Sequence, residues 1–223
     1  MTVASARLHP VGGREGLLWL PEDAEQLLVL APGAGAGMRH AFLEAMAAAL
    51  AGVRVGTLRF EFPYQAAGKR RPDRAPVLID AACEAVEAAV GVAGGLPLLA
   101  GGKSMGGRMT SQAAAAGRLE AVRALVFVGF PLHAAGKPGV ERAAHLEQVG
   151  QPMLFLQGTR DALADLALLA PIVEKLGQRA RLHVVEGADH GFHVLKRSGR
   201  TDAEVITELA TEIARGAGTF VKK

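Results

Sequence analysis

One short stretch of the chain has the residue types and spacing that point most directly to chemistry. Residues 102–106 read Gly-Lys-Ser-Met-Gly, a G-x-S-x-G pattern that follows the apolar run Leu96 to Ala100 and precedes a segment of helical period. A serine at the tip of a sharp strand-to-helix turn has a strained backbone and an exposed hydroxyl, and the flanking glycines avoid a clash. The pattern predicts Ser104 as a nucleophile, with a helix amino-terminus aimed at developing negative charge. A turn that needs only small residues is the structural alternative.

A serine nucleophile needs a general base, and the base needs a carboxylate that orients it. Asp161 lies in the loop after the apolar run Met153 to Leu156, and His190 lies in the loop after Leu182 to Val185. The chain order of Ser104, Asp161 and His190 is one of the orders found in Ser-His-Asp hydrolases. We therefore predict that Asp161 orients His190 and that His190 removes the Ser104 proton.

Nearby residues offer alternatives for the acid and for the base. Asp161 could instead be a turn or helix-capping residue, in which case Asp165 is the other candidate carboxylate. Asp189 is too close in sequence to His190 to orient it. His193 is the rival base, but His190 lies nearer the strand end and is followed by a glycine that leaves it room.

A second glycine-rich loop is expected to complete an acyl-transfer site. Residues 32–37, Pro-Gly-Ala-Gly-Ala-Gly, follow another continuous apolar run. Such a loop would supply one backbone N–H to the oxyanion, with Ala34 as the first choice and Gly35 as the second. The other N–H would come from Met105, the residue after the nucleophile. Dinucleotide binding is disfavoured because the G-x-G-x-x-G pattern needs glycine where Met38 stands.

The sequence predicts no cofactor and no metal. The lysine at position 103 precedes the serine and the full glycine spacing is missing, so the turn is not a phosphate loop. The histidines at positions 183, 190 and 193 could suggest a metal site, but they form no H-E-x-x-H pattern, and His183 lies within a predicted strand.

The elements that must position these residues alternate along the chain between short apolar runs and longer segments of helical period. This alternation predicts an α/β fold: a mostly parallel sheet of six to eight strands with helices on both faces, in a single domain spanning residues 1–223. Ligands bind such sheets at the carboxyl ends of the strands. The expected strands are Leu27–Ala31, Arg54–Phe60, Leu96–Ala100, Val122–Val128, Met153–Leu156 and Leu182–Val185, with Leu17–Leu20 as an added edge strand.

The expected helices are defined by periodic apolar residues and by one capping signal. The pattern Thr201-x-x-Glu204 is a capping box that should begin the last helix. The other helices are expected over Phe42–Leu50, along a face made by Ile79, Cys83, Val86 and Val90, around Met109–Ala116, and over Leu163–Leu176 with a kink at Pro171.

Composition excludes several classes of protein. Half of the 223 residues are hydrophobic and 21% are charged, so the chain can bury a sizeable core. The net charge is only +3, and the basic residues 69–71 are soon followed by Asp73, which favours a solvated loop over a nucleic-acid site. With one Trp, one Tyr and eight Phe, the chain also has few platforms for base stacking.

The chain is predicted to be soluble and cytoplasmic. Its single cysteine, Cys83, excludes an internal disulfide and suits a reducing compartment. Charged residues at positions 7, 14 and 15 interrupt any amino-terminal apolar stretch, and no uncharged apolar run reaches the length of a membrane span. We expect neither a membrane partner nor a nucleic-acid partner, and the oligomeric state is not predicted.

Several segments resemble the small α/β-hydrolases of the dienelactone-hydrolase-like group. The similarity is greatest to its poorly characterised branch, which includes a human chromatin-complex subunit and testis-expressed relatives. It covers Gln26 to Arg215 and implies Ser104 as nucleophile, Asp161 as acid and His190 as base. The resemblance is carried by residues 102–107 (GKSMGG), 157–161 (QGTRD), 188–191 (ADHG), 60–64 (FEFPY), 68–72 (GKRRP) and 130–133 (FPLH).

The chain departs from the pattern of that group at two places. Many relatives have His-Gly before the oxyanion residue, whereas Pro32 and Gly33 stand here. Dienelactone hydrolases proper use a cysteine nucleophile, whereas this chain has Ser104. Cys83 cannot replace it, because it lies on the apolar face of a predicted helix and is most simply a core residue. A specific dienelactone activity is therefore not implied.

The expected function is hydrolysis of a small or extended ester or thioester through an acyl-enzyme. The segment Pro131 to Gln151, where many relatives insert a lid, is short, so the site should be open. Phe130 and His133 are expected to line the substrate pocket. The alternative is a non-catalytic hydrolase-like scaffold that binds a partner through the same surface.

Overall fold

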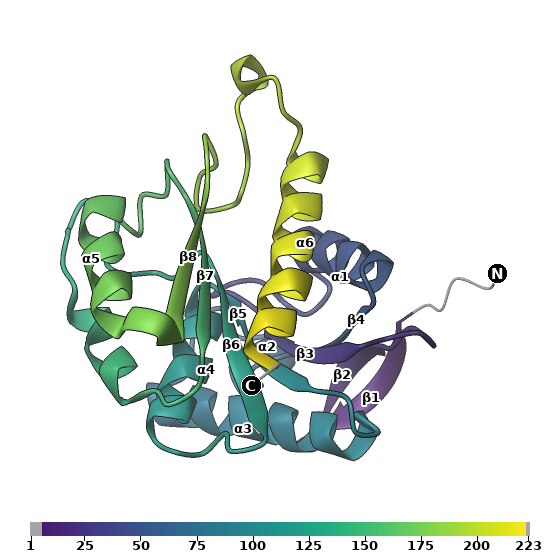
Figure 1. The fold of residues 1–223 in the computed structure, drawn as a ribbon. Helices are drawn as coiled ribbons and strands as arrows, with labels where there is room; N and C mark the ends of the chain where they lie inside the picture. Colours follow the sequence, from purple (N-terminus) through teal and green to yellow (C-terminus); the bar gives the residue numbers. More distant parts are fainter. Residues whose placement is uncertain (1–5, 222–223) are drawn as a thin grey trace.

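The computed structural model describes residues 6–221 as one eight-stranded sheet covered by helices on both faces (Figure 1). The predicted fold class is confirmed. The strands are β1 (Arg7–Val11), β2 (Arg14–Trp19), β3 (Gln26–Ala31), β4 (Val55–Phe60), β5 (Leu98–Lys103), β6 (Val122–Val128), β7 (Met153–Gly158) and β8 (Ala180–Val185). The helices are α1 (Ala41–Gly52), α2 (Pro63–Ala66), α3 (Ala75–Val92), α4 (Met105–Ala115), α5 (Leu166–Leu176) and α6 (Asp202–Val221), with short 3-10 helices η1 (Glu141–Gln148), η2 (Gly177–Arg179) and η3 (Lys196–Ser198).

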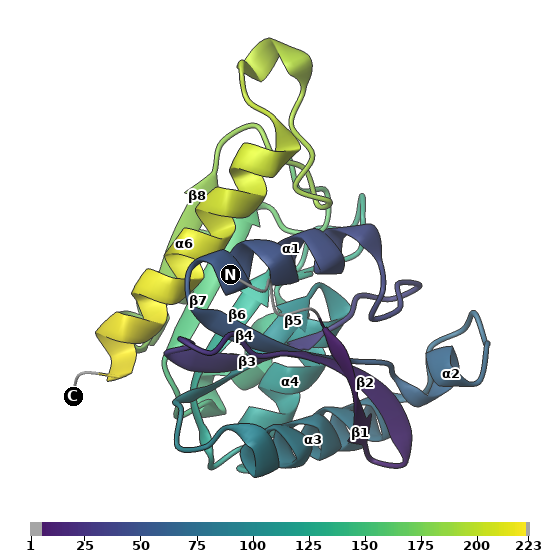
Figure 2. The same cartoon turned by 90° about the vertical axis from the view of Figure 1, so that its right-hand side faces the viewer.

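The strand order across the sheet is β1-β2-β4-β3-β5-β6-β7-β8. Strands β1 and β2 pair antiparallel to their neighbours, and every pairing from β4 to β8 is parallel. The ends of β3, β5, β7 and β8 therefore meet at one edge, where the candidate site residues were expected. Figure 2 shows α1 and α6 side by side on one face, while α3 and α4 cover the other.

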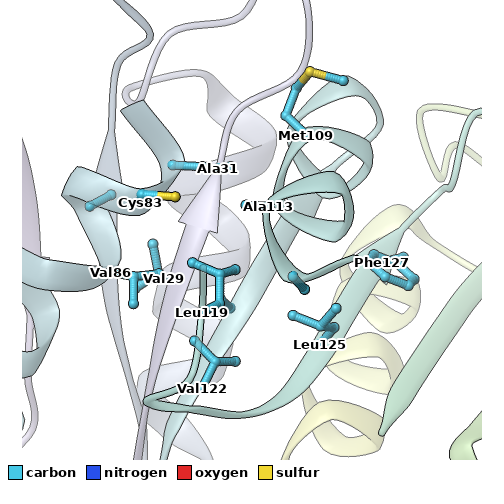
Figure 3. Packing of buried hydrophobic residues seen from close by; sticks show 14 of the residues in the cluster. Val29, Ala31, Cys83, Val86, Met109, Ala113, Leu119, Val122, Leu125 and Phe127 are labelled. Atoms are coloured by element: carbon cyan, nitrogen blue, oxygen red, sulfur yellow. The ribbon is translucent and has the colours of Figure 1, made fainter. Parts of the chain in front are cut away.

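Burial on both faces explains why the parallel strands read as continuous apolar runs. In β3, Val29 and Ala31 pack against α3 and α4, whereas Leu28 and Leu30 face α1 and α6. Figure 3 shows the first of these layers, with Cys83 of α3 inside it. Each fully buried leucine or valine contributes about 1.5–3 kcal/mol to the free energy of folding relative to an exposed position. The two layers therefore determine which face of β3 packs against which helices.

The amino-terminal strands differ from the prediction. The expected edge strand Leu17–Leu20 is instead β2, the second strand of the sheet, and β1 forms the edge. Gly12 and Gly13, both at positive φ, close a tight hairpin between the two strands. Strand β1 was not predicted because an edge strand needs no apolar run and tolerates a proline, here Pro10.

The helices follow the predicted periods with two differences. In α3, Cys83 and Val86 are buried as expected, but Val90 is 51% exposed, because alanines make most of the buried face. Helix α5 begins at Leu166 rather than Leu163, since Asp165 caps it. The capping box of α6 is confirmed: the N–H of Glu204 donates to Oγ1 of Thr201 over 3.2 Å.

The segment between β6 and β7 adds no layer over the carboxyl edge of the sheet. It contains η1, which packs sideways against α4. The site edge is therefore left open, as the short segment predicts. Within residues 6–221, no helix combines the length and apolarity that a bilayer crossing requires.

Candidate active site

Ser104 occupies a strained turn between β5 and α4. Its φ of 51° and ψ of −117° lie in a region that residues other than glycine rarely adopt, at a cost of about 1–3 kcal/mol. A Cβ at Gly106 would lie 2.5 Å from the carbonyl oxygen of Pro32, and one at Gly102 would collide with that of Ala31. Both flanking positions therefore need glycine, as the sequence pattern predicts.

The turn brings the serine hydroxyl to the predicted base. Oγ of Ser104 lies 2.9 Å from Nε2 of His190, and Nδ1 of the same imidazole lies 2.7 Å from Oδ2 of Asp161. Because an ionised carboxylate only accepts hydrogen bonds, Nδ1–H is the donor to Asp161. Nε2 is then left with a lone pair that can accept the hydroxyl proton. This geometry is the one that general-base activation of a serine requires.

Asp161 combines the two roles that the sequence left as alternatives. Its Oδ1 accepts the N–H of Leu163 over 2.8 Å, while Oδ2 accepts from His190. The Asp161 side chain is fully buried, so its oxygens depend on these donors. A further donor, Nε2 of Gln157, lies 2.5 Å from Oδ2. Sequence reasoning missed Gln157, although a fully buried glutamine near the end of an apolar strand is an unusual residue choice.

The alternative carboxylates build local structure away from the imidazole. Asp165 accepts the N–H of Ala167 over 2.8 Å and so begins α5. Asp189 accepts the N–H groups of Gly191 and His193 over 2.8 and 3.0 Å, which shapes the loop after β8. Neither aspartate hydrogen-bonds to His190 through its side chain.

The other histidines of this region also have separate partners. His193 is exposed and pairs with Asp202, whose hydrogen bond raises the pKa of the imidazole. His183, on β8, lies 2.6 Å from Oε1 of Glu208 on α6. Among residues 6–221, no group of three or more His, Cys, Asp or Glu side chains is arranged to hold a metal ion.

The loop after β3 contains both residues that the sequence offers as its oxyanion donor, and their N–H groups differ in whether they are already hydrogen-bonded. The N–H of Gly35, the second-choice oxyanion donor, is bonded to Oη of Tyr64 over 3.3 Å. Within the described part of the chain, the N–H groups of Ala34 and Met105 have no protein acceptor. The N–H groups of Ala34 and Met105 are therefore free to bind an acceptor, and their role as oxyanion donors stays a prediction.

The side chain of Gln65 holds this loop in shape. Its amide nitrogen donates to the carbonyl oxygens of Gly33 and Ala36, and its amide oxygen accepts the N–H of Phe62. The loop is thus braced by α2, which lies more than twenty residues further along the chain. A donor held in place in this way loses little freedom when negative charge develops.

A cavity of about 340 Å³ opens beside Ser104 and His190. Its wall is mainly apolar and is contributed by the loop after β3, by α1 and by the loops after β5, β7 and β8. The lining residues are Gly33, Ala34, Ala36, His40, Phe42, Leu43, Lys103, Ser104, Leu163, His190 and Gly191.

Two residues expected in the pocket lie elsewhere. Phe130 is 1% exposed and packs edge-on against Phe127 and Phe155 in the core. Both ring nitrogens of His133 are bonded within the protein, Nδ1 to the carbonyl of Ala134 and Nε2 to the N–H of Asp165. Both residues were expected in the pocket because they follow the end of β6. The chain turns into the core after β6, so their side chains are buried there instead.

The strained serine turn, the loop after β3 and the eight-stranded sheet are together characteristic of the α/β-hydrolase class. The chain belongs to the family described as "Alpha/beta hydrolase domain", whose sequence profile matches residues 24–218. This membership is broader than the branch suggested by the sequence motifs, and that branch remains a prediction, as does the single-domain organisation.

Solved structures share this fold. A dienelactone hydrolase from Anabaena variabilis gives a TM-score of 0.71 at 23% identity, covering 93% of this chain and 94% of that one. XC6422 from Xanthomonas campestris, an α/β serine hydrolase without a lid, gives 0.72 at 22% identity, covering 96% and 95%. Est1E from Butyrivibrio proteoclasticus gives 0.66 at 15% identity, covering 96% and 99%. At these identities the likeness concerns the fold alone.

The close approach at Gly106 leads to a stability prediction. Gly106→Ala should destabilise the protein by about 2 kcal/mol or more, because the new methyl group meets rigid backbone. Gly91→Ala is the matched control, since Gly91 is exposed in α3 with open space around it, and it should stabilise by about 0.5–1 kcal/mol. Urea denaturation of both variants measures the difference. Equal stabilities would contradict the close packing at the turn.

Proposed function

We propose that this protein is a serine hydrolase that cleaves a small or extended ester or thioester through an acyl-enzyme intermediate. The observation that carries the proposal is the continuous chain of hydrogen bonds from Ser104 through His190 to Asp161, with distances of 2.9 and 2.7 Å. It is supported by the two N–H groups at Ala34 and Met105 that have no protein acceptor in the described chain.

The reaction follows from the positions of these groups. His190 takes the proton of Ser104 through Nε2 as the serine oxygen bonds to the substrate carbonyl carbon. The negative charge on the carbonyl oxygen is stabilised by the N–H groups of Ala34 and Met105, and Asp161 stabilises the imidazolium. The imidazolium then protonates the leaving alcohol or thiol. Water attacks the acyl-enzyme with His190 again as base, which releases the acid and restores the serine.

The cavity favours acyl groups of modest size. Its volume of about 340 Å³ and its apolar wall, with Phe42, Leu43 and Leu163, suit a short apolar chain or a small ring. Among proteins of this fold, Est1E has been solved with ferulic acid bound, which supports a small carboxylic acid as the product here too. No dienelactone activity is proposed, since the nucleophile position holds serine.

Substitution of the nucleophile is the first test. Ser104→Ala should lower kcat for p-nitrophenyl acetate by about 10³-fold or more, because covalent catalysis is lost while the protein folds normally. Ser198→Ala, at an exposed serine in η3, is the control and should retain wild-type turnover. A fluorophosphonate probe should label the wild type and not Ser104→Ala. Equal turnover by wild type and Ser104→Ala, with no labelling, would favour the non-catalytic scaffold.

The size of the cavity gives a second prediction. Across p-nitrophenyl esters from acetate to octanoate, kcat/KM should be highest for the short acyl chains and should fall toward octanoate, because longer chains extend beyond the apolar wall. Long-chain triglycerides should be poor substrates. A preference for triglycerides over short esters, measured by titration of released acid, would contradict the proposed substrate class.

Gln157 provides a test of how Asp161 is held. Gln157→Leu removes one donor to Oδ2 while filling most of the same buried space, so we expect kcat to fall about tenfold with little change in KM. Gln148→Leu, at an exposed glutamine of η1, is the control. Unchanged kcat in Gln157→Leu, with an unchanged melting temperature, would show that the bond does not position Asp161.

A further inference from the structure

Lys103 occupies the unspecified position of the G-x-S-x-G pattern just before the proposed nucleophile, and it contacts the loop that contains the proposed base. Its Nζ donates to the main-chain carbonyl oxygen of His190 over 2.5 Å. The ammonium also lies over two aromatic rings, 5.9 Å from the centroid of Phe42 and 5.5 Å from that of Phe192. These rings stack on each other, so Lys103 joins β5 both to α1 and to the loop after β8.

The surroundings of the ammonium are closely fitted. Gly129, at the end of β6, has a positive φ of 70°, and a Cβ there would lie 3.1 Å from Nζ. The same Cβ would lie 3.5 Å from Nδ1 and Cε1 of His190. Nζ and the imidazole therefore border the same small space, which a side chain at position 129 would fill.

The charged and titratable groups around Lys103 come from only a few elements. Asp161, after β7, and Asp189, after β8, attract the ammonium but make no hydrogen bond to it. His190 contacts it through the main chain, and His40, before α1, lines the same cavity. Burial is the larger effect and lowers the pKa of Lys103 to about 8.

We propose that Lys103 is a positioning residue, whose ammonium holds the main chain at His190 so that the imidazole stays within reach of Ser104. This inference rests on the proposed hydrolase function. A charge-assisted hydrogen bond is shorter and about twice as strong as a neutral one, and the two rings add cation–π attraction. Holding the carbonyl of the base's own residue fixes the loop at the point where displacement would most affect proton transfer.

Loss of the Lys103 proton should weaken this contact. The neutral amine keeps a hydrogen bond to the carbonyl, but the charge-assisted part and the attraction to the rings are lost. Because the pKa is lowered to about 8, this change falls within an accessible pH range. The value of kcat/KM should therefore fall as the pH rises through about 8. An arginine at the same position stays protonated and should remove that fall.

Three variants test the role. At pH 7, Lys103→Met should lower kcat/KM for p-nitrophenyl acetate by about tenfold or more. Lys103→Arg should recover much of that loss and keep its activity up to pH 10, where the wild type has declined. Lys69→Met, at an exposed lysine, is the control and should follow the wild-type profile. The same alkaline decline in wild type and Lys103→Arg, or full activity in Lys103→Met, would overturn the proposal.

A second measurement, an NMR titration, uses only the wild-type protein and does not depend on turnover. In wild-type protein with ¹³C-labelled lysine and ¹⁵N-labelled backbone, one Cε resonance should titrate near pH 8, and the His190 and Gly191 amides should shift in the same step. A Lys103 that titrates at the ordinary lysine value, or amides that do not respond, would overturn the proposal. If wild type hydrolyses esters no faster than Ser104→Ala, the proposed function fails, and the NMR titration still decides whether Lys103 holds this loop.

Discussion

The candidate site depends on one unfavourable backbone conformation, that of Ser104. Its positive φ is maintained because β5 and α4 pass so close to the end of β3 that only glycine fits at positions 102 and 106. The strain is offset by the apolar layers on both faces of the sheet, which keep β3 and β5 paired. The position of the Ser104 hydroxyl beside the cavity is therefore a consequence of core packing as much as of the local turn.

The parts of the site come from the ends of β3, β5, β7 and β8, and polar side chains that take no direct part in the proposed reaction hold them in place. Gln157 braces Asp161, and Gln65 braces the loop that contains Ala34. Lys103 contacts the loop that contains His190. In each case a polar side chain hydrogen-bonds to a carboxylate or to a main-chain carbonyl beside the site. These bonds restrict the movement of the surrounding loops and so maintain the shape of a small open cavity.

The open edge of the sheet and the modest size of the cavity have the same cause, which is the path of the segment after β6. The segment after β6 packs against α4 through η1, and it does not cover the carboxyl ends of the strands. The residues expected to line the pocket from that segment, Phe130 and His133, are instead used to anchor it. The wall is completed from the other side, by Phe42 and Leu43 of α1.

The sequence by itself determined the fold class and named the residues that the structure brings together. The glycine spacing of residues 102–106 predicts the strained turn. Asp161 and His190 follow the ends of strands, and parallel pairing brings such ends to one edge of the sheet. These signals are local, or depend only on strand direction. The tertiary structure decided the edge position of β1, the inward turn at Phe130, and the contacts of Gln157 and Lys103. These depend on side-chain directions and on approaches between distant segments, which periodicity and composition do not encode.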